Sequence, residues 1–201
     1  MITGSPWLPF SESSKALGAR REIRIPGQSV QVDVKYLKLR QGRLYQFTAI
    51  DEATRYRILK IYDHNTIASA IDFIEELRRR LPVAIQRIQT DHGSEFGTDF
   101  TWHLHDLGSI HRHIPPRCPE SNRKVERSHR TDADEFYRRV TFQTAEELRV
   151  KLRVWEHEYN HRRPHLALRG KTPAEQLCEL RISTPAPIPR SGEARHAERR
   201  A

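Results

Sequence analysis

The chain has 201 residues, 36% of them apolar, and its 35 lysines and arginines against 26 acidic residues give a net charge of +9. This length is enough for one domain with a hydrophobic core, and the cationic excess favours nucleic acid over a membrane surface as partner. The two cysteines are isolated, which excludes a disulfide framework and fits a reducing compartment. Because no apolar run approaches the roughly 18 residues of a membrane span and no secretory signal is recognisable, we expect a soluble, cytoplasmic protein without a membrane partner.

The N-terminal half predicts three strands after a flexible lead. Residues 1–25 mix Ser, Pro, Gly and charge without a period, which is typical of a linker. Three strand-like runs follow, and the short turns between them favour an antiparallel meander. These runs are Ser29 to Leu39, Arg43 to Asp51 and Tyr56 to Tyr62.

Alternating helix and strand patterns come next. A helix capped at Asn65 or Thr66 repeats apolar residues every three or four positions and ends in arginines before Pro82. The strand Ala84 to Thr90 then follows a helical crossover, which makes it parallel to a strand of the meander. An amphipathic segment from Asp99 to Leu107 and a short strand from Ser109 to Ile114 complete a mixed five-stranded α/β sheet.

Helical patterns dominate the C-terminal part. The proline-rich residues 115–119 predict a loop, and a helix restarts near Ser121. Capping boxes start two further helices, at Thr144 and at Thr172, and the second of these helices runs through Leu180. We therefore predict a core over residues 26–180 and a disordered basic tail over residues 181–201. The apolar stripe expected for the helix after Ser121 is Val125, His129, Ala133, Phe136 and Val140.

Three acidic residues form a candidate site. Asp91 ends a predicted strand before the turn at Gly93, Asp33 lies between valines within a strand, and Glu126 lies on a basic helix. The carboxyl ends of strands open onto the ligand crevice in α/β sheets, and a charge within a sheet needs a partner or a metal. Each acid alone fits an ordinary turn or an ion pair, but two or three carboxylates together suit hard divalent cations that neutralise a reacting phosphodiester.

At these acids the chain resembles the retroviral-integrase-like catalytic core of bacterial insertion-sequence transposases. The similarity covers Asp33 in its strand, residues 90–96, the motif Lys124-Val125-Glu126-Arg127, and the C-terminal stretch from Tyr159 to His165. The resemblance implies a ribonuclease H-like fold with a D, D, E triad that binds two Mg²⁺ or Mn²⁺ ions. The implied reactions are cutting at element ends and transfer of the freed 3′-hydroxyl into target DNA, by a nucleoid-associated dimer or higher oligomer.

The sequence departs from the family pattern at three points. His92 replaces an expected Asn, Arg123 replaces a glycine before the Glu126 motif, and the spacing from Asp91 to Glu126 is about one residue short. The upstream helix-turn-helix region of the family is also missing from the sequence. These departures leave two alternatives open, a catalytically inactive DNA-binding or regulatory remnant and a metal-dependent nuclease or ribonuclease H.

Basic residues supply the expected DNA contacts. We assign this role to residues of the Glu126 helix and to the turn after Tyr159, because cations on a basic chain bind the phosphate backbone. The predicted DNA-binding residues are Arg123, Lys124, Arg127, Arg130, Arg162 and Arg163. A zinc site at the histidines between 92 and 113 is disfavoured, since cysteine or acidic partners are absent from that pattern.

Overall fold

The structure is a computed structural model that describes residues 23–39, 42–114 and 123–183. Its sheet has five strands in the order β3-β2-β1-β4-β5. β1 pairs antiparallel with β2, which pairs antiparallel with β3, whereas β1 pairs parallel with β4 and β4 parallel with β5. The predicted mixed sheet is thereby confirmed. The strands are β1 (Val30–Leu39), β2 (Gly42–Asp51), β3 (Arg57–Tyr62), β4 (Arg87–Thr90) and β5 (Ile110–His113).

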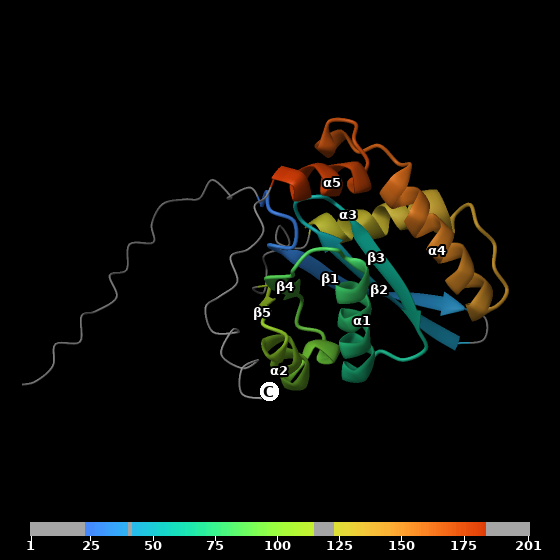
Figure 1. Ribbon diagram of the computed structural model, residues 1–201. Coiled ribbons are helices and arrows are strands. Elements are labelled where there is room, and N and C mark those ends of the chain that lie inside the picture. The colour runs from blue at the N-terminus through green and yellow to red at the C-terminus, as the bar shows by residue number, and fades with distance from the viewer. Residues whose placement is uncertain (1–22, 40–41, 115–122, 184–201) are drawn as a thin grey trace, which may run out of the picture.

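Helices cover both faces of this sheet (Figure 1). They are α1 (Ile67–Arg80), α2 (Thr98–Asp106), α3 (Arg123–Thr131), α4 (Ala145–His161) and α5 (Pro173–Ser183). Val32, Phe47 and Ile58 belong to the core beneath α1 and α2, while Leu37 and Leu59 face the second core beneath α4. Side chains that alternate along a strand thus point into the two cores on opposite faces of the sheet, as the pleat of a β-strand requires.

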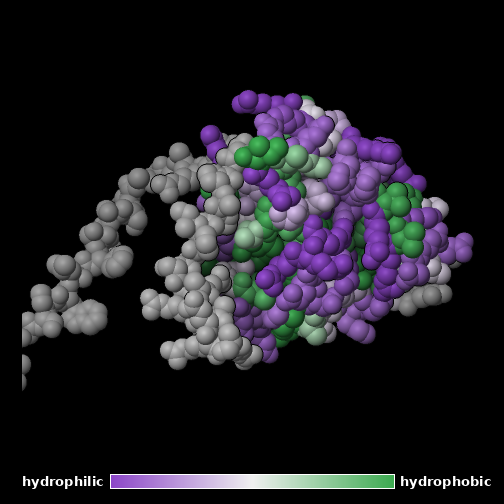
Figure 2. Space-filling model, in the orientation of Figure 1, coloured by the Kyte–Doolittle hydropathy of each residue, from purple (hydrophilic) through white to green (hydrophobic). Residues whose placement is uncertain are grey.

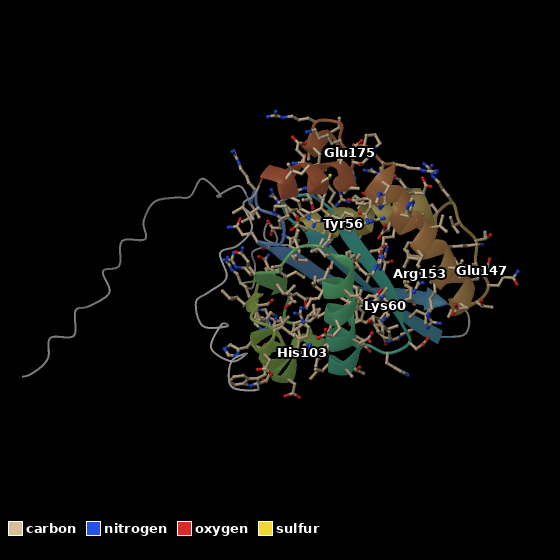
Figure 3. All side chains as sticks on the ribbon, in the orientation of Figure 1. Tyr56, Lys60, His103, Glu147, Arg153 and Glu175 are labelled. Atoms are coloured by element: carbon tan, nitrogen blue, oxygen red, sulfur yellow. The ribbon has the colours of Figure 1, made fainter. Side chains whose placement is uncertain are left out.

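The predicted helix starts agree with the structure. Thr66 caps α1 by accepting a hydrogen bond from the Ser69 backbone, and Thr144 caps α4 in the same way. Thr172 and Glu175 form a reciprocal capping box at α5, in which each side chain accepts the other residue's backbone N–H. α5 extends to Ser183, three residues beyond its predicted end. Glu147 and Glu175 mark the starts of α4 and α5 in Figure 3.

The strand predicted from Ala84 to Thr90 is shorter than expected. β4 begins only at Arg87. The backbone N–H of the residue before it, Gln86, bonds outside the sheet, because it donates to the Gly27 carbonyl at 2.8 Å. Gly27 has a φ of +77°, and a Cβ there would lie 2.2 Å from the Ala84 carbonyl oxygen. Glycine is therefore needed where these two segments cross.

The segment after Ser121 also differs from its prediction. α3 ends at Thr131 and continues as a π-helix, Asp132–Tyr137, and the expected stripe is wrong at His129 and Ala133. Val125 and Phe136 of that stripe are buried, but Ser128 and Asp132 are buried in place of His129 and Ala133. The Asp132 carboxylate faces the interior because it pairs with a buried arginine.

That arginine is Arg57, at the start of β3. Its Nη1 lies 2.6 Å from Asp132 Oδ1 and 3.0 Å from Ser128 Oγ, and both charged side chains are fully buried. Trp155 of α4 donates to the same Asp132 oxygen at 2.7 Å, and the Tyr159 ring lies 3.4 Å from the guanidinium carbon. This buried ion pair joins β3, α3, the π-helix and α4.

Side chains of α4 cover the edge strand β3. Asn160 accepts from the Arg57 N–H at 3.0 Å and donates to the Arg57 carbonyl at 2.8 Å, and Glu156 accepts from the Leu59 N–H. An uncovered edge would offer these groups to another chain. Part of the C-terminal motif, residues 159–165, thus completes the fold.

Among the described helices none is long and apolar enough to cross a bilayer. In Figure 2 the visible face is mostly hydrophilic, with a hydrophobic patch over α4, where Val150 and Val154 are exposed. The predicted lead, proline loop and basic tail lie wholly or largely outside the described residues, which omit 1–22, 115–122 and 184–201.

Removal of one partner of the buried pair should destabilise the fold. Asp132→Ala is expected to lower the free energy of unfolding by about 3–5 kcal/mol, because Arg57 would keep a buried, uncompensated charge. The double variant Arg57→Met with Asp132→Leu should recover most of that loss. Urea denaturation measures both changes.

The matched control is Asp72→Ala, which removes the exposed pair with Lys60, the residue marked in Figure 3. We expect it to change stability by about 0–1 kcal/mol. Equal losses for Asp132→Ala and Asp72→Ala would contradict the structural role of the buried pair.

Candidate functional site

Asp33 and Asp91 lie on adjacent strands. β1 and β4 are parallel, with Val30 opposite Ile88 and Gln31 opposite Gln89. Continuing this register by two residues sets Asp33 beside Asp91, at the point where β4 has ended. The expected pairing of the strand that carries Asp33 with the strand that leads to Asp91 is confirmed. Adjacent strands are about 4.8 Å apart, so the two carboxylates originate from backbone positions close enough to share a ligand.

Asp33 has a partner from α3. Its Oδ2 accepts a hydrogen bond from His129 Nε2 at 3.1 Å, and both side chains are mostly buried. One turn earlier, the Val125 N–H donates to Gln31 Oε1 at 3.2 Å. These contacts attach α3 to the face of β1 that carries Asp33, and they meet the expectation that a carboxylate within a strand has a partner.

Asp91 is held by its own turn. Its Oδ1 accepts the Gly93 N–H at 3.0 Å, and the residue is exposed to solvent. A Cβ at Gly93 would lie 2.7 Å from the buried carboxylate of Glu95. A side chain at this position would displace the Glu95 carboxylate, so Gly93 leaves room for that buried group beside the turn that carries Asp91.

Glu126 lies in the first turn of α3 and is exposed. Its helix packs on β1 and β2, as the prediction of a helix approaching the two aspartates requires. Within the described ranges, however, no three His, Cys, Asp or Glu side chains converge closely enough to hold a metal ion. The aspartate pair supplies hard oxygen donors of the kind that divalent cations prefer, and Glu126 does not complete a three-residue cluster in this conformation.

A basic groove lies between α3 and the turn after α4. This hollow of about 600 Å³ is lined by arginines and a lysine from both segments, over Tyr159 and His165. Four of the six predicted DNA-binding residues meet there, whereas Arg130 and Arg162 do not line it. The cationic side chains of the groove are Arg55, Arg123, Lys124, Arg127 and Arg163.

Carboxylates already neutralise part of this groove. Lys124 Nζ lies 2.9 Å from Glu52 Oε2, and Arg163 donates two hydrogen bonds to Glu135 at 2.8 and 2.5 Å. The hydrogen bond from Arg163 lowers the pKa of the Glu135 carboxyl below its usual value. An anion entering the groove would exchange these ion pairs for its own contacts.

His129, Arg57 and Asp132 were missed as contributors to this region. His129 was expected on an apolar stripe, yet it contacts Asp33, and Asp132, which was assigned no role, pairs with Arg57. The only sequence signal for Asp132 is its spacing of four from Ser128 and Phe136, which places three residues on one side of a helix. That spacing becomes informative only once the buried Arg57 is known.

The arrangement of strands and helices is that of integrase catalytic cores, a ribonuclease H-like fold. The catalytic core of BIV integrase superposes with a TM-score of 0.61 at 18% identity, covering 78% of this chain and 97% of that one. A magnesium complex of the HTLV-2 integrase core, described as trimeric, gives 0.60 at 15% identity over 75% and 96% of the two chains. A chain of the simian T-cell lymphotropic virus intasome gives 0.65 at 18% identity over 86% and 61%.

Sequence comparison then gives the family. Two family models described as integrase core domain match residues 24–119 and 107–173, so that together they span most of the chain. The chain belongs to this integrase core family, the retroviral-integrase-like catalytic core of insertion-sequence transposases. Members of the family are polynucleotidyl transferases of DNA integration and recombination, and they generally use divalent metal ions.

Two curated relatives match over most of this chain. An ORF3 protein of Spiroplasma virus SpV1-C74 that is named as an integrase is 30% identical over 200 residues, covering 88% of this chain. A protein of insertion element IS407 from Burkholderia multivorans is 27% identical over 178 residues, covering 84%. The chain spans 55% and 62% of the lengths of these relatives.

His165 should make stability depend on pH. Burial, and then the charges of Arg163, Arg57 and Arg55, lower the pKa of His165 from 6.5 to about 4. The unfolded chain therefore binds a proton between pH 6.5 and 4 that the folded chain does not, so this contribution to stability is present above pH 6.5 and lost as the pH falls towards 4. We expect His165→Asn to reduce the loss of stability between pH 6.5 and 4, as measured by urea denaturation at several pH values. His64→Asn, at an exposed position, should not reduce it.

Proposed function

We propose that this chain is a metal-dependent DNA transposase or integrase core in which Asp33, Asp91 and Glu126 are the catalytic metal ligands. The observation that carries the proposal is the register of β1 and β4, which supports a shared site for Asp33 and Asp91 at the end of β4. Two Mg²⁺ or Mn²⁺ ions would neutralise charge on the attacking and leaving oxygens of a phosphodiester and promote deprotonation of the nucleophile. The reactions proposed are DNA strand cleavage and transfer of a 3′-hydroxyl.

Each of the three acids has a distinct part in this proposal. Asp33 is fixed in a strand, and His129 of α3 orients its carboxylate. Asp91 is presented by a turn in which Gly93 engages one carboxylate oxygen. Glu126 is exposed in the first turn of α3, and it must move towards the aspartates to become the third ligand. Conformational closure of this kind is common when substrate completes a catalytic site.

The basic groove and its surroundings are proposed to bind the DNA backbone. Groove residues such as Arg127 would contact phosphates, and the exposed Arg130 and Arg162 would extend the contact area. The DNA partners are element ends and target DNA. Because two ends must be joined together, the active form would be a homodimer or higher oligomer, located with DNA at the bacterial nucleoid.

A second candidate is a catalytically inactive DNA-binding or regulatory protein. It is favoured by Arg123 in place of the expected glycine beside Glu126, and by the lack of a converged three-residue metal cluster among the described residues. The basic groove would serve either function equally, so chemistry rather than binding must separate them.

A strand-transfer assay separates the two candidates. With Mg²⁺ or Mn²⁺ and a pre-cut DNA end, we expect the wild-type chain to nick or transfer the strand, and Asp91→Asn to abolish this activity, because loss of one carboxylate charge weakens metal binding. Folding and DNA binding should persist in Asp91→Asn, as circular dichroism and a binding titration would report.

Arg123→Gly is the informative companion variant. If it is active where the wild type is inert, the arginine holds Glu126 out of place and the chain is a degenerate enzyme. If both chains bind DNA but remain inert with either metal and several DNA ends, the enzyme proposal is wrong and the binding function is supported.

DNA affinity should fall steeply with salt. Each phosphate contact adds about −0.9 to the slope of log K against log salt concentration, so Arg127→Glu should weaken binding for any DNA sequence and reduce that slope by roughly 1. Fluorescence anisotropy at several salt concentrations measures both. Arg153→Glu on α4 is the matched control, because Arg153 is exposed and lies outside the groove (Figure 3). If Arg127→Glu and Arg153→Glu weaken DNA binding equally, the proposed role of the groove is wrong.

A further inference from the structure

Three histidine rings form a ladder beside Asp91. The inner ring, His111 of β5, has one nitrogen 2.9 Å from the Thr90 hydroxyl and the other 2.7 Å from the Thr101 hydroxyl. It also contacts the edge of Phe100, with ring centroids 5.0 Å apart. Both nitrogens of this ring are occupied, so His111 is a fixed support for the rings above it.

The two outer rings extend from this support to the surface. His113 lies 4.2 Å from His111, centroid to centroid, and its Nδ1 donates to the Asp91 carbonyl at 3.1 Å. His92 stacks on His113 at 4.9 Å with only 9° between the ring planes. Both outer residues are exposed, so a nearly parallel pair of rings lies at the surface next to Asp91.

A cavity of about 510 Å³ opens beside this pair. Its walls are His92, His113, the turn from Gly93 to Thr98, Thr101 and Trp102 of α2. The Trp102 side chain is 61% exposed and contacts His105 edge-on rather than the core. Aromatic faces therefore line one cavity from two elements. We call this cavity, with His92, His113 and Trp102, the ring pocket.

The shape of the pocket selects a flat ligand. Stacked imidazoles turn their faces towards each other, so their nitrogens do not converge on one point as metal ligands must. Among the described residues no metal-holding cluster exists at these histidines. Flat π-faces are instead what proteins offer to nucleobases, which stack on aromatic side chains regardless of base identity.

We propose that the ring pocket binds one unpaired nucleobase of the DNA strand whose phosphate is held at Asp91. This inference rests on the proposed function, which identifies the bound strand as the DNA strand that is cut or transferred. It adds a binding site for a base of that strand to the proposed site for its phosphate. The base must be unpaired, because a base within a duplex is stacked on both sides and would have to be extruded first. The pocket thus favours frayed or overhanging ends over blunt ones.

The test uses 2-aminopurine, a fluorescent base that is quenched on stacking, in two DNA molecules. In one the analogue is the unpaired base of a short overhang, and in the other it is paired at a blunt end. Binding is measured with Mg²⁺ on DNA whose ends lack a 3′-hydroxyl, so that the metal can hold the phosphate while strand transfer cannot occur. For the wild-type chain we expect tighter binding of the overhang and quenching of its analogue.

Variants of the ring pocket should remove this preference. His92→Ala and Trp102→Leu should each weaken overhang binding by roughly 5- to 100-fold, the effect of losing one stacked base, while blunt-end affinity stays unchanged. His92→Phe retains a planar ring and should keep most of the preference. His157→Ala removes another exposed, stacked histidine, on α4, and is the matched control with no expected effect.

Failure of the inference is distinguishable from failure of the proposed function. Strand transfer without any overhang preference, or equal losses for overhang and blunt DNA in His92→Ala, would overturn the ring pocket alone. A chain that prefers overhangs through His92 and Trp102 but shows no strand transfer supports the pocket and overturns only the proposed chemistry.

Discussion

The buried pair of Arg57 and Asp132 is the constraint on which the rest of the structure depends. A guanidinium and a carboxylate that are removed from water are costly to bury unless they pair and gain further hydrogen bonds. Ser128 bonds Arg57, and Trp155 and Gln46 bond Asp132, while Arg57 Nε and Nη2 have no hydrogen-bond partner among the described residues. Because Ser128 and Trp155 come from α3 and α4, the pair fixes both helices against the edge of the sheet. The position of α3 in turn determines where Glu126 and the basic residues stand.

The same constraint explains why the C-terminal motif contributes to the fold as well as to a surface. Asn160 and Glu156 cover the backbone of β3, and the Tyr159 ring lies over the guanidinium of Arg57. The following turn then brings Arg163 to the groove beside α3. Residues that contact the sheet and residues that line the groove thus alternate within a short segment.

Two surfaces of different chemistry are formed by segments that contact or carry the aspartates, the basic groove by α3 and the ring pocket by the turn after β4. The basic groove holds guanidinium and ammonium groups that are partly neutralised by Glu52 and Glu135, which suits exchange with phosphates. The ring pocket carries aromatic faces, supported from below by His111. A DNA strand offers both phosphate and base, and the two surfaces match these two components.

Sequence alone determined the strands, the order of helices, the capped helix starts and the pairing of the strand that carries Asp33 with the strand that leads to Asp91, because periodicity, turn residues and the crossover rule act locally or on topology. The contact of His129 with Asp33, the inward rotation of Asp132 and the stacking of His92 on His113 were decided only by tertiary structure. Each of these contacts is between residues that are roughly 20 to 100 positions apart in the sequence. A local sequence pattern does not indicate which distant side chain will pair with a buried charge. The helix that begins at Arg123 illustrates the reason, since Asp132 is buried against Arg57 in place of the expected Ala133.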